Sequence, residues 1–154
     1  MTTATTPRLH RTLPAEFRER LLVAAQPVDL PQGVRLFNEG GRADRFWIIR
    51  SGAVQLDLRV PGRRPAVIGK LGPGDLVGWS WLLAPHVWQL GATTASAVRA
   101  DMFDADMVRR MCADDRELGQ AVALWVGEVV AGRLLAARTS LLDLYAPYGS
   151  GARG

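Results

Sequence analysis

The side chains able to do chemistry in this sequence do not form a catalytic set. The only histidines are His10 and His86, which are far apart and have no partner at metal-ligand spacing. A serine nucleophile needs a base beside it, and neither histidine is placed to serve one. The serines considered are Ser51, Ser80, Ser96 and Ser140. The sequence therefore predicts no enzyme, no metal site and no cofactor.

Cys112 is the only cysteine, which excludes an intramolecular disulfide and a cysteine-based zinc site. Its position beside Arg109 and Arg110 allows a lowered thiol pKa and therefore some reactivity. The alternative is a structural thiol, because free cysteines are usually buried. We expect the structural role.

The composition is that of one globular domain, with 154 residues of which 48% are hydrophobic and 22% charged. No apolar run approaches the ~20 residues of a membrane-spanning helix. The threonine-rich start, residues 1–10, lacks the apolar stretch of a signal peptide. We therefore expect a cytoplasmic protein. The net charge of +4 comes from eighteen arginines and one lysine spread along the chain, without the basic stripe that nucleic acid requires.

Short apolar runs divided by glycine and proline fill residues 28–103. Within one run Val54, Leu56 and Leu58 alternate with polar residues, as in a strand buried on one face. Many short strands with no helix between them predict an antiparallel β-roll or jelly roll, mostly β with flanking helices. The predicted strands are 34–37, 46–49, 53–58, 66–71, 76–77, 92–97 and 98–103.

A helix is predicted on the N-terminal side of this β region. Proline is tolerated in a first turn, so the helix can begin near Pro14, with Thr12 or a neighbour as its cap; Pro27 stops it. Residues 1–12 are expected to be a flexible tail, and 146–154 a second one. One domain is therefore placed at 13–145.

Two helices are predicted after the strands. Asp104 can cap a short helix through Cys112, and Asp106 lies favourably in its first turn. A longer helix runs over about 114–145. Asp104 with Asp106, and the acidic pair at 114–115, are interpreted as capping charges rather than as a general acid–base pair.

The longer helix is apolar along two stripes, and both must be buried. One stripe is assigned to a homodimer contact, because two-fold dimers are the commonest oligomers; the alternative is a helix buried wholly within its own chain. The dimer stripe consists of Leu118, Val122, Trp125, Val129, Gly132 and Ala136. The second stripe includes Ala121, Leu124, Leu135 and Leu142.

Two motifs in the β region carry a family resemblance. Residues 36–54 read LFNEGGRADRFWIIRSGAV, and residues 71–78 read LGPGDLVG. Together they resemble the cyclic nucleotide-binding domain family, the β-roll of catabolite-activator-like proteins, over about residues 13–145. The resemblance implies a roll with a phosphate-binding cassette, in which the amides of a short helix and its loop hold the cyclic phosphate.

The sequence departs from the family where the nucleotide would be held. The resemblance implies a glutamate for the ribose after the cassette glycine, and an arginine for the phosphate about a dozen residues later. Gly78 is present, but Trp79 follows it, and Gln89 or Leu90 stands at the arginine position. Burying a phosphate without a cation is costly, so we expect no ordinary binding of cAMP or cGMP. The degenerate cassette comprises Gly78, Trp79, Ser80, Trp81, Leu82, Gln89, Leu90, Gly91, Ala92 and Thr93.

This cassette contains three tryptophans within a stretch of ten residues: Trp79, Trp81 and Trp88. Three interpretations stay open. The rings plug a vestigial cavity, they stack on an apolar or aromatic ligand, or they form a patch that docks another protein.

The leading hypothesis for function is a non-catalytic regulatory or adaptor module. The family's bacterial regulators carry a helix-turn-helix after the long helix, and the nine residues after Tyr145 are too few for one. We therefore expect no DNA binding by this chain alone. The alternative is a true cyclic-nucleotide or other small-molecule sensor with a rebuilt pocket, in which Arg99, Arg133 or Arg138 replaces the missing cation. A cupin-like enzyme is disfavoured because the roll offers only one histidine.

Overall fold

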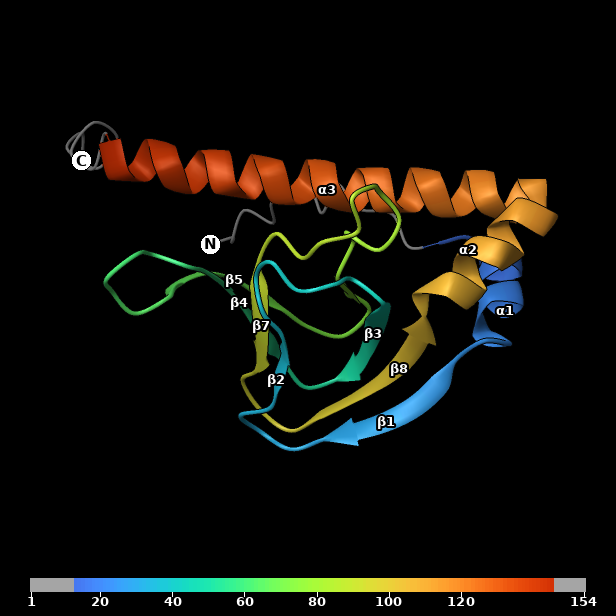
Figure 1. Cartoon of the computed structure of the whole chain (residues 1–154), viewed down its shortest axis with the longest axis horizontal. Helices are drawn as coiled ribbons and strands as arrows, with labels where there is room; N and C mark the ends of the chain where they lie inside the picture. The colour runs from blue at the N-terminus through green and yellow to red at the C-terminus, as the bar shows by residue number, and fades with distance from the viewer. Residues whose placement is uncertain (1–12, 146–154) are drawn as a thin grey trace, which may run out of the picture.

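The computed structural model describes residues 13–145, so the two predicted tails, 1–12 and 146–154, lie outside the described residues. In chain order, one short helix is followed by eight strands and then by two helices (Figure 1). In chain order the elements are α1 (Ala15–Leu22), β1 (Gln26–Leu30), β2 (Arg35–Phe37), β3 (Arg45–Ser51), β4 (Val54–Leu58), β5 (Ala66–Leu71), β6 (Leu76–Val77), β7 (Gly91–Thr94), β8 (Val98–Asp104), α2 (Ala105–Asp114) and α3 (Arg116–Tyr145).

The strands form two antiparallel sheets of four, in the orders β1-β8-β3-β6 and β2-β7-β4-β5. This confirms the predicted roll with flanking helices. β1 was not predicted, because Pro27 was interpreted as a helix stop. Proline cannot donate to a ladder and is therefore confined to sheet edges, and β1 is an edge strand that pairs only with β8.

The core lies between the two sheets and beneath α3. Its largest fully buried side chains include Trp81, Phe46 and Phe103. The ring of Phe46 stacks on that of Trp81 at 4.2 Å and on that of Phe103 at 4.7 Å, between ring centroids. Stacked rings of this kind supply large buried areas from few residues, which suits a roll built from short strands.

The helix ends follow from local chemistry. Asp104 caps α2 as predicted, its carboxylate accepting a hydrogen bond from the backbone N–H of Met107 at 2.9 Å. Asp115 does the same for α3 and accepts from the backbone N–H of Leu118 at 3.2 Å. Pro14 occupies the N-cap position of α1, where no described side chain makes a capping bond. That helix ends at Leu22, before Pro27, because the chain turns there toward β1.

α3 lies across one side of the roll as a single rod (Figure 1). Leu118, Val122, Trp125 and Val129 are buried against the core of their own chain. This corrects the predicted dimer stripe, since these four side chains are not available to a partner. Gly132 is half-buried and Ala136 exposed.

The other predicted stripe of α3 is the one that faces outward. Leu124 is 61% exposed, Leu135 41% and Leu142 59%. The first stripe therefore meets the roll and the three leucines of the second face outward, because periodicity marks a face as apolar without saying which apolar face meets the roll.

α3 is also long and apolar enough to cross a membrane by length and composition alone, with a mean hydropathy of 1.3 over its most apolar stretch. This corrects the expectation that no segment of the chain reaches that limit. A core helix of a globular protein passes the same test, and the first half of α3 packs on the roll through buried side chains.

Candidate functional site

The cassette begins where β6 ends, at a glycine that the local geometry requires. Gly78 has φ +94°, and a Cβ built on it would lie 2.6 Å from two ring carbons of Trp88. Only glycine adopts such a φ without strain. The sharp turn therefore lets the indole of Trp88 lie directly against the backbone.

Two of the three cassette tryptophans are buried. Trp88 is 4% exposed, and its ring stacks on Phe37 of β2 with the centroids 3.8 Å apart. Trp81 is fully buried on Phe46, and its indole N–H donates to the carbonyl of Gly78 at 3.2 Å. Trp79 is half-buried and packs on the edge of the core. The rings of Trp81 and Trp88 are thus part of the hydrophobic core.

The cassette contains turns in place of the short helix that the resemblance implies. Residues 78–90 are described throughout and form no helix. Backbone bonds tie the loop to residues 40–43 instead: Trp88 donates to the carbonyl of Gly41 at 2.8 Å, and Ala43 donates to that of His86 at 2.8 Å. The free backbone amides at a helix start can bind an anion. Here the amide of Trp88 is instead bonded to the carbonyl of Gly41.

The resemblance implies an arginine at the position of Gln89 or Leu90. Gln89 is exposed, and its side-chain amide donates to the carbonyl of Val87 at 3.1 Å. Leu90 is half-buried, while Gly91 and Ala92 are buried in β7. Ser80 is buried and Leu82 half-buried. Residues 78–82 and 89–93 thus lie on one continuous loop and its following strand, and none supplies a cation.

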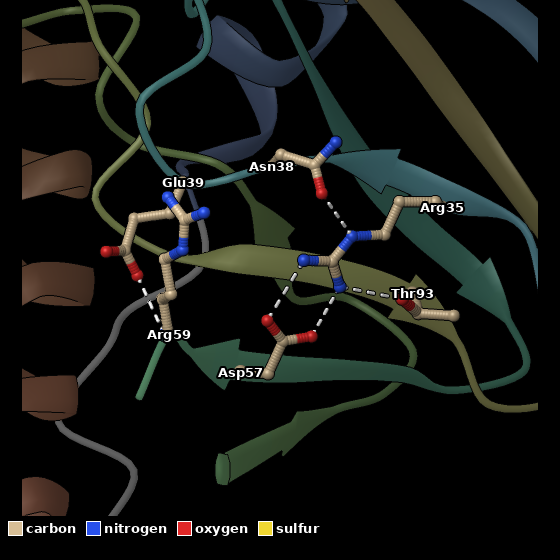
Figure 2. A network of polar contacts seen from close by, with 6 residues as sticks. All are labelled: Arg35, Asn38, Glu39, Asp57, Arg59 and Thr93. Carbon is tan, nitrogen blue, oxygen red and sulfur yellow. Dashed lines mark hydrogen bonds and ion pairs between the residues drawn. The ribbon is translucent and has the colours of Figure 1, made fainter. Parts of the chain in front are cut away.

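An ion pair that sequence reasoning missed lies over β7. Arg35 of β2 makes a two-pronged contact with Asp57 of β4, in which one of the two bonds is 3.1 Å long (Figure 2). Its guanidinium also donates to the side-chain oxygens of Asn38 at 2.8 Å and Thr93 at 3.0 Å. Asp57 is buried, with its side chain 8% exposed, whereas that of Arg35 is 36% exposed.

Gly91 makes room for this pair. A Cβ at this position would lie 2.1 Å from a guanidinium nitrogen of Arg35 and 2.5 Å from a carboxylate oxygen of Asp57. The register places Arg35 opposite Thr93, and Asp57 opposite Gly91. Strand register between distant segments has no local signature, so only a correct pairing of β2, β7 and β4 would have revealed the contact. The guanidinium of Arg35 is therefore held against the carboxylate of Asp57.

The three arginines that could replace the missing cation of the cassette lie in different surroundings. Arg99 is 75% exposed and pairs with Asp29 across β1 and β8 at 3.3 Å. Arg138 is exposed on α3. Arg133 reaches back from α3 to donate to the carbonyl of Leu76, two residues before Gly78. Burial lowers the pKa of Arg133 to about 10, a shift that the nearby Asp75 carboxylate opposes.

α2 also holds the cassette. Arg109 donates to the backbone carbonyl of Trp81 and pairs with Asp106 one turn earlier on its own helix. Cys112 lies on the same helix and is half-buried. Its burial, and to a smaller extent the nearby Asp115 carboxylate, raise the pKa of its thiol. The thiol is therefore held protonated rather than activated, which fits the structural role.

A two-sheet roll with a cassette after β6 and a long helix across it defines a class of regulatory ligand-binding domains. The model of the cyclic nucleotide-binding domain matches residues 27–115. The chain belongs to this family, as the sequence resemblance indicated.

A relative and several solved structures extend the comparison. The chain is 36% identical over 119 residues to a CRP-like cAMP-activated global transcriptional regulator of Mycobacterium tuberculosis, an alignment that covers 77% of this chain and 51% of the relative. The chain therefore spans about half the length of this regulator. Relatives of this class are transcriptional regulators rather than enzymes.

The fold is shared with solved proteins at lower identity. The c-di-GMP responsive regulator CLP of Xanthomonas campestris superposes with a TM-score of 0.76 at 18% identity, over 86% of this chain and 65% of that one. The catabolite activator protein of Thermus thermophilus gives 0.69 at 22% identity, over 90% and 63%. A cyclic nucleotide-binding protein of Geobacter metallireducens gives 0.69 at 23% identity, over 87% and 99%.

Proposed function

We propose that this chain is a non-catalytic, cytoplasmic regulatory or adaptor module: a homodimer through α3 whose cassette does not hold a cyclic nucleotide in the ordinary way. The observation that carries the proposal is the buried pair of indoles. Trp81 and Trp88 stack on Phe46 and Phe37, so the interior that a nucleotide would need is filled with side chains.

Electrostatics support the same conclusion. The cassette residues include no cation, and the nearby Arg35 is held by the buried carboxylate of Asp57. A cyclic phosphate entering the site would lose its hydration without gaining a paired charge, which is strongly unfavourable in a low-dielectric interior. Output through another protein is then favoured over output through a nucleotide.

The test is a calorimetric titration of the full chain with cAMP, cGMP and c-di-GMP, with tryptophan fluorescence as a second readout. The cAMP-activated relative from Mycobacterium tuberculosis serves as the positive control for the assay. We expect no heat and no fluorescence change for this chain. Saturable binding of any of the three at micromolar concentration would refute the degenerate cassette.

The alternative, a sensor with a rebuilt pocket, is favoured by one observation only. Arg133 is a largely desolvated cation whose guanidinium lies beside β6, next to the start of the cassette. If a nucleotide bound, Arg133→Met should abolish the binding. Arg99→Met is the matched control, because Arg99 is exposed on β8, which β3 separates from β6, and it pairs there with Asp29. Its loss should leave affinity unchanged.

The homodimer is supported by an uncharged stripe on the exposed side of α3. Its members recur at alternating spacings of four and three, the pattern of helices that pair in a coiled coil. We name it the charge-free seam; it consists of Ala123, Gly127, Val130, Leu134, Ala137, Leu141 and Leu144. Leu134 is 67% exposed, Leu141 53% and Leu144 76%. In a parallel or antiparallel pair these leucines would be covered.

The dimer is tested by sedimentation equilibrium of the full chain. We expect a dimer or a larger assembly for the wild type, and a monomer for Leu134→Glu with Leu141→Glu. Glu117→Gln is the control, because Glu117 is an exposed residue in the first turn of α3 and lies outside the charge-free seam; it should not change the mass. Dissociation of the wild type to a monomer on 100-fold dilution, to below about 1 µM, is compatible with the proposal. A wild type that is monomeric at hundreds of micromolar would refute it.

A further inference from the structure

Positive charge is concentrated on the hairpin formed by β4 and β5. We name residues 58–71 the basic hairpin; it contains no acidic residue, and its cations are Arg59, Arg63, Arg64 and Lys70. The whole chain has nineteen lysines and arginines and fifteen acidic residues, a net charge of +4. The cations of the basic hairpin therefore equal the net charge of the protein, and the rest of the chain is balanced.

The fold does not use these four cations in ion pairs. All four residues are exposed, and among residues 13–145 none of them pairs with an acidic side chain. The carboxylate of Glu39 accepts from the backbone N–H of Arg59 at 3.0 Å, not from its side chain (Figure 2). Unpaired cations gathered in one place give a positive potential that attracts an anionic partner. Elsewhere in the chain the arginines paired with acidic side chains are Arg20, Arg35, Arg45, Arg50, Arg99 and Arg109.

A tight turn holds the tip of the basic hairpin in place. The backbone N–H of Arg63 donates to the carbonyl of Val60 at 3.0 Å, and Gly62 has φ +73°. A proline followed by a glycine with positive φ is typical of a type II turn, and Pro61 precedes Gly62 here. Arg63 and Arg64 therefore follow directly on a fixed turn, at the end of a hairpin that extends beyond the rest of the roll (Figure 1).

The second strand of the hairpin has an unpaired edge. β5 is the outer strand of the sheet β2-β7-β4-β5 and pairs only with β4. Within the part of the chain that the structure describes, its residues make no backbone hydrogen bond beyond that ladder. Only Leu71 of its six residues is buried, whereas Val67 is 59% and Ile68 48% exposed. Such an edge can accept another extended chain as an added strand.

The charge of the hairpin restricts which chain can pair with this edge. A second copy of β5 would bring like charges together across the strands, which is destabilising, whereas an acidic strand would place opposite charges there. Single-stranded nucleic acid is bound largely by stacking on aromatic side chains, and the basic hairpin contains none. Duplex DNA and anionic lipid require only positive charge, so they would leave the strand edge and its exposed apolar side chains unused.

We infer that the outer edge of β5, together with Arg63, Arg64 and Lys70, binds an extended acidic segment of another protein as an added strand. Main-chain hydrogen bonds to β5 hold the segment, and the cations bind its carboxylates. Val67 and Ile68 contact the apolar side chains between those carboxylates. The inference rests on the proposed function, because it names the surface through which the adaptor reaches a partner protein.

The test measures the binding of fluorescein-labelled peptides to the full chain by fluorescence anisotropy. The probe is a peptide of about eight residues that alternates glutamate with valine, long enough to span β5; its counterpart alternates lysine with valine. We expect saturable binding of the acidic peptide and none of the basic one. Raising the ionic strength from about 0.1 M to about 1 M should weaken the binding several-fold, because exposed charges are screened.

Charge reversal in the turn tests the cations without touching the core. Arg63→Glu with Arg64→Glu should weaken binding of the acidic peptide by about tenfold or more, because attractive contacts become repulsive. The control is Arg110→Glu with Arg116→Glu, which changes the net charge equally at exposed positions on α2 and α3 and should change the affinity less than about twofold. Tryptophan fluorescence checks that each variant is folded. Equal weakening by the two pairs would overturn the site, since only the total charge would then matter.

A change in the peptide tests strand addition while the protein stays intact. N-methylation of its central amides removes the N–H groups that a strand donates to its neighbour and keeps every carboxylate. The methylated peptide should bind about tenfold more weakly or worse, and an unchanged affinity would overturn strand addition. Short duplex DNA and phosphatidylserine vesicles are measured in parallel. Tighter binding of either one than of the acidic peptide, lost on Arg63→Glu with Arg64→Glu, would overturn the protein partner in favour of a phosphate-bearing one.

The failure of this inference can be distinguished from the failure of the proposed function. A chain that binds neither the acidic peptide nor any cyclic nucleotide overturns the surface on β5 and leaves the degenerate cassette intact. A chain that binds both cAMP and the acidic peptide overturns the degenerate cassette, and the surface on β5 stands.

Discussion

The backbone of Gly78 and the indole of Trp88 are in direct contact: a single added Cβ on the glycine would lie 2.6 Å from the ring. The first residue of the cassette and its last tryptophan are therefore a matched pair. The turn at Gly78 admits the ring, and the ring, stacked on Phe37, holds the loop against the roll. The contact links the family's glycine to the feature that distinguishes this chain.

Gly78→Ala should destabilise the chain by about 3 kcal/mol, because it adds a strained φ and a clash with Trp88. Gly62→Ala is the matched control. Gly62 also has a positive φ, +73°, but open space surrounds its would-be Cβ, so it should cost only about 1 kcal/mol. Urea unfolding followed by tryptophan fluorescence measures both. Equal losses would show that the ring contact contributes nothing.

The pair formed by Arg35 and Asp57 should behave as an ion pair whose carboxylate is buried. Arg35→Met alone leaves the Asp57 carboxylate uncompensated, and we expect a loss of about 3 kcal/mol in unfolding free energy. Arg35→Met combined with Asp57→Leu removes both charges and should regain most of that loss. Additive losses in the double variant would contradict this account.

Asp115 should make the stability of the chain depend on acid pH. Its pKa is lowered, first by the backbone N–H of Leu118 and further by Arg20 at 2.9 Å. A carboxyl whose folded pKa lies below its unfolded value stabilises above the unfolded pKa, and the stabilisation is lost as pH falls through the folded one. The stability difference between wild type and Asp115→Asn should therefore be present at neutral pH and vanish in acid. A difference that is constant with pH would argue for packing instead.

Cys112 should react slowly. Burial raises the pKa of its thiol, so the thiolate fraction at pH 8 is below that of a free cysteine. We expect alkylation by iodoacetamide to be roughly tenfold slower in the folded chain than in urea. Reaction at equal rates in the two states would show that the thiol is accessible and activated.

Local patterns were sufficient for most elements of this fold, with β1 as the exception. The alternation of Val54, Leu56 and Leu58 predicted the strand β4, and Asp104 predicted the start of α2, because both depend on residues within a few positions of each other. The buried face was predicted only in part, since a register shift after Leu56 leaves Leu58 40% exposed and Asp57 buried. The departure that the resemblance implies at Trp79 and Gln89 likewise comes from the sequence, and it stays a prediction.

The tertiary structure alone decided which distant residues meet. The contact between Arg35 and Asp57 depends on the register of three strands, and the burial of Trp88 depends on Phe37, some fifty positions away. The two apolar stripes of α3 were evident from periodicity, yet only packing assigned Val122 to the roll and left Leu124 outside. Helical spacing fixes which side chains share a face, whereas the partner of that face is set by the rest of the molecule.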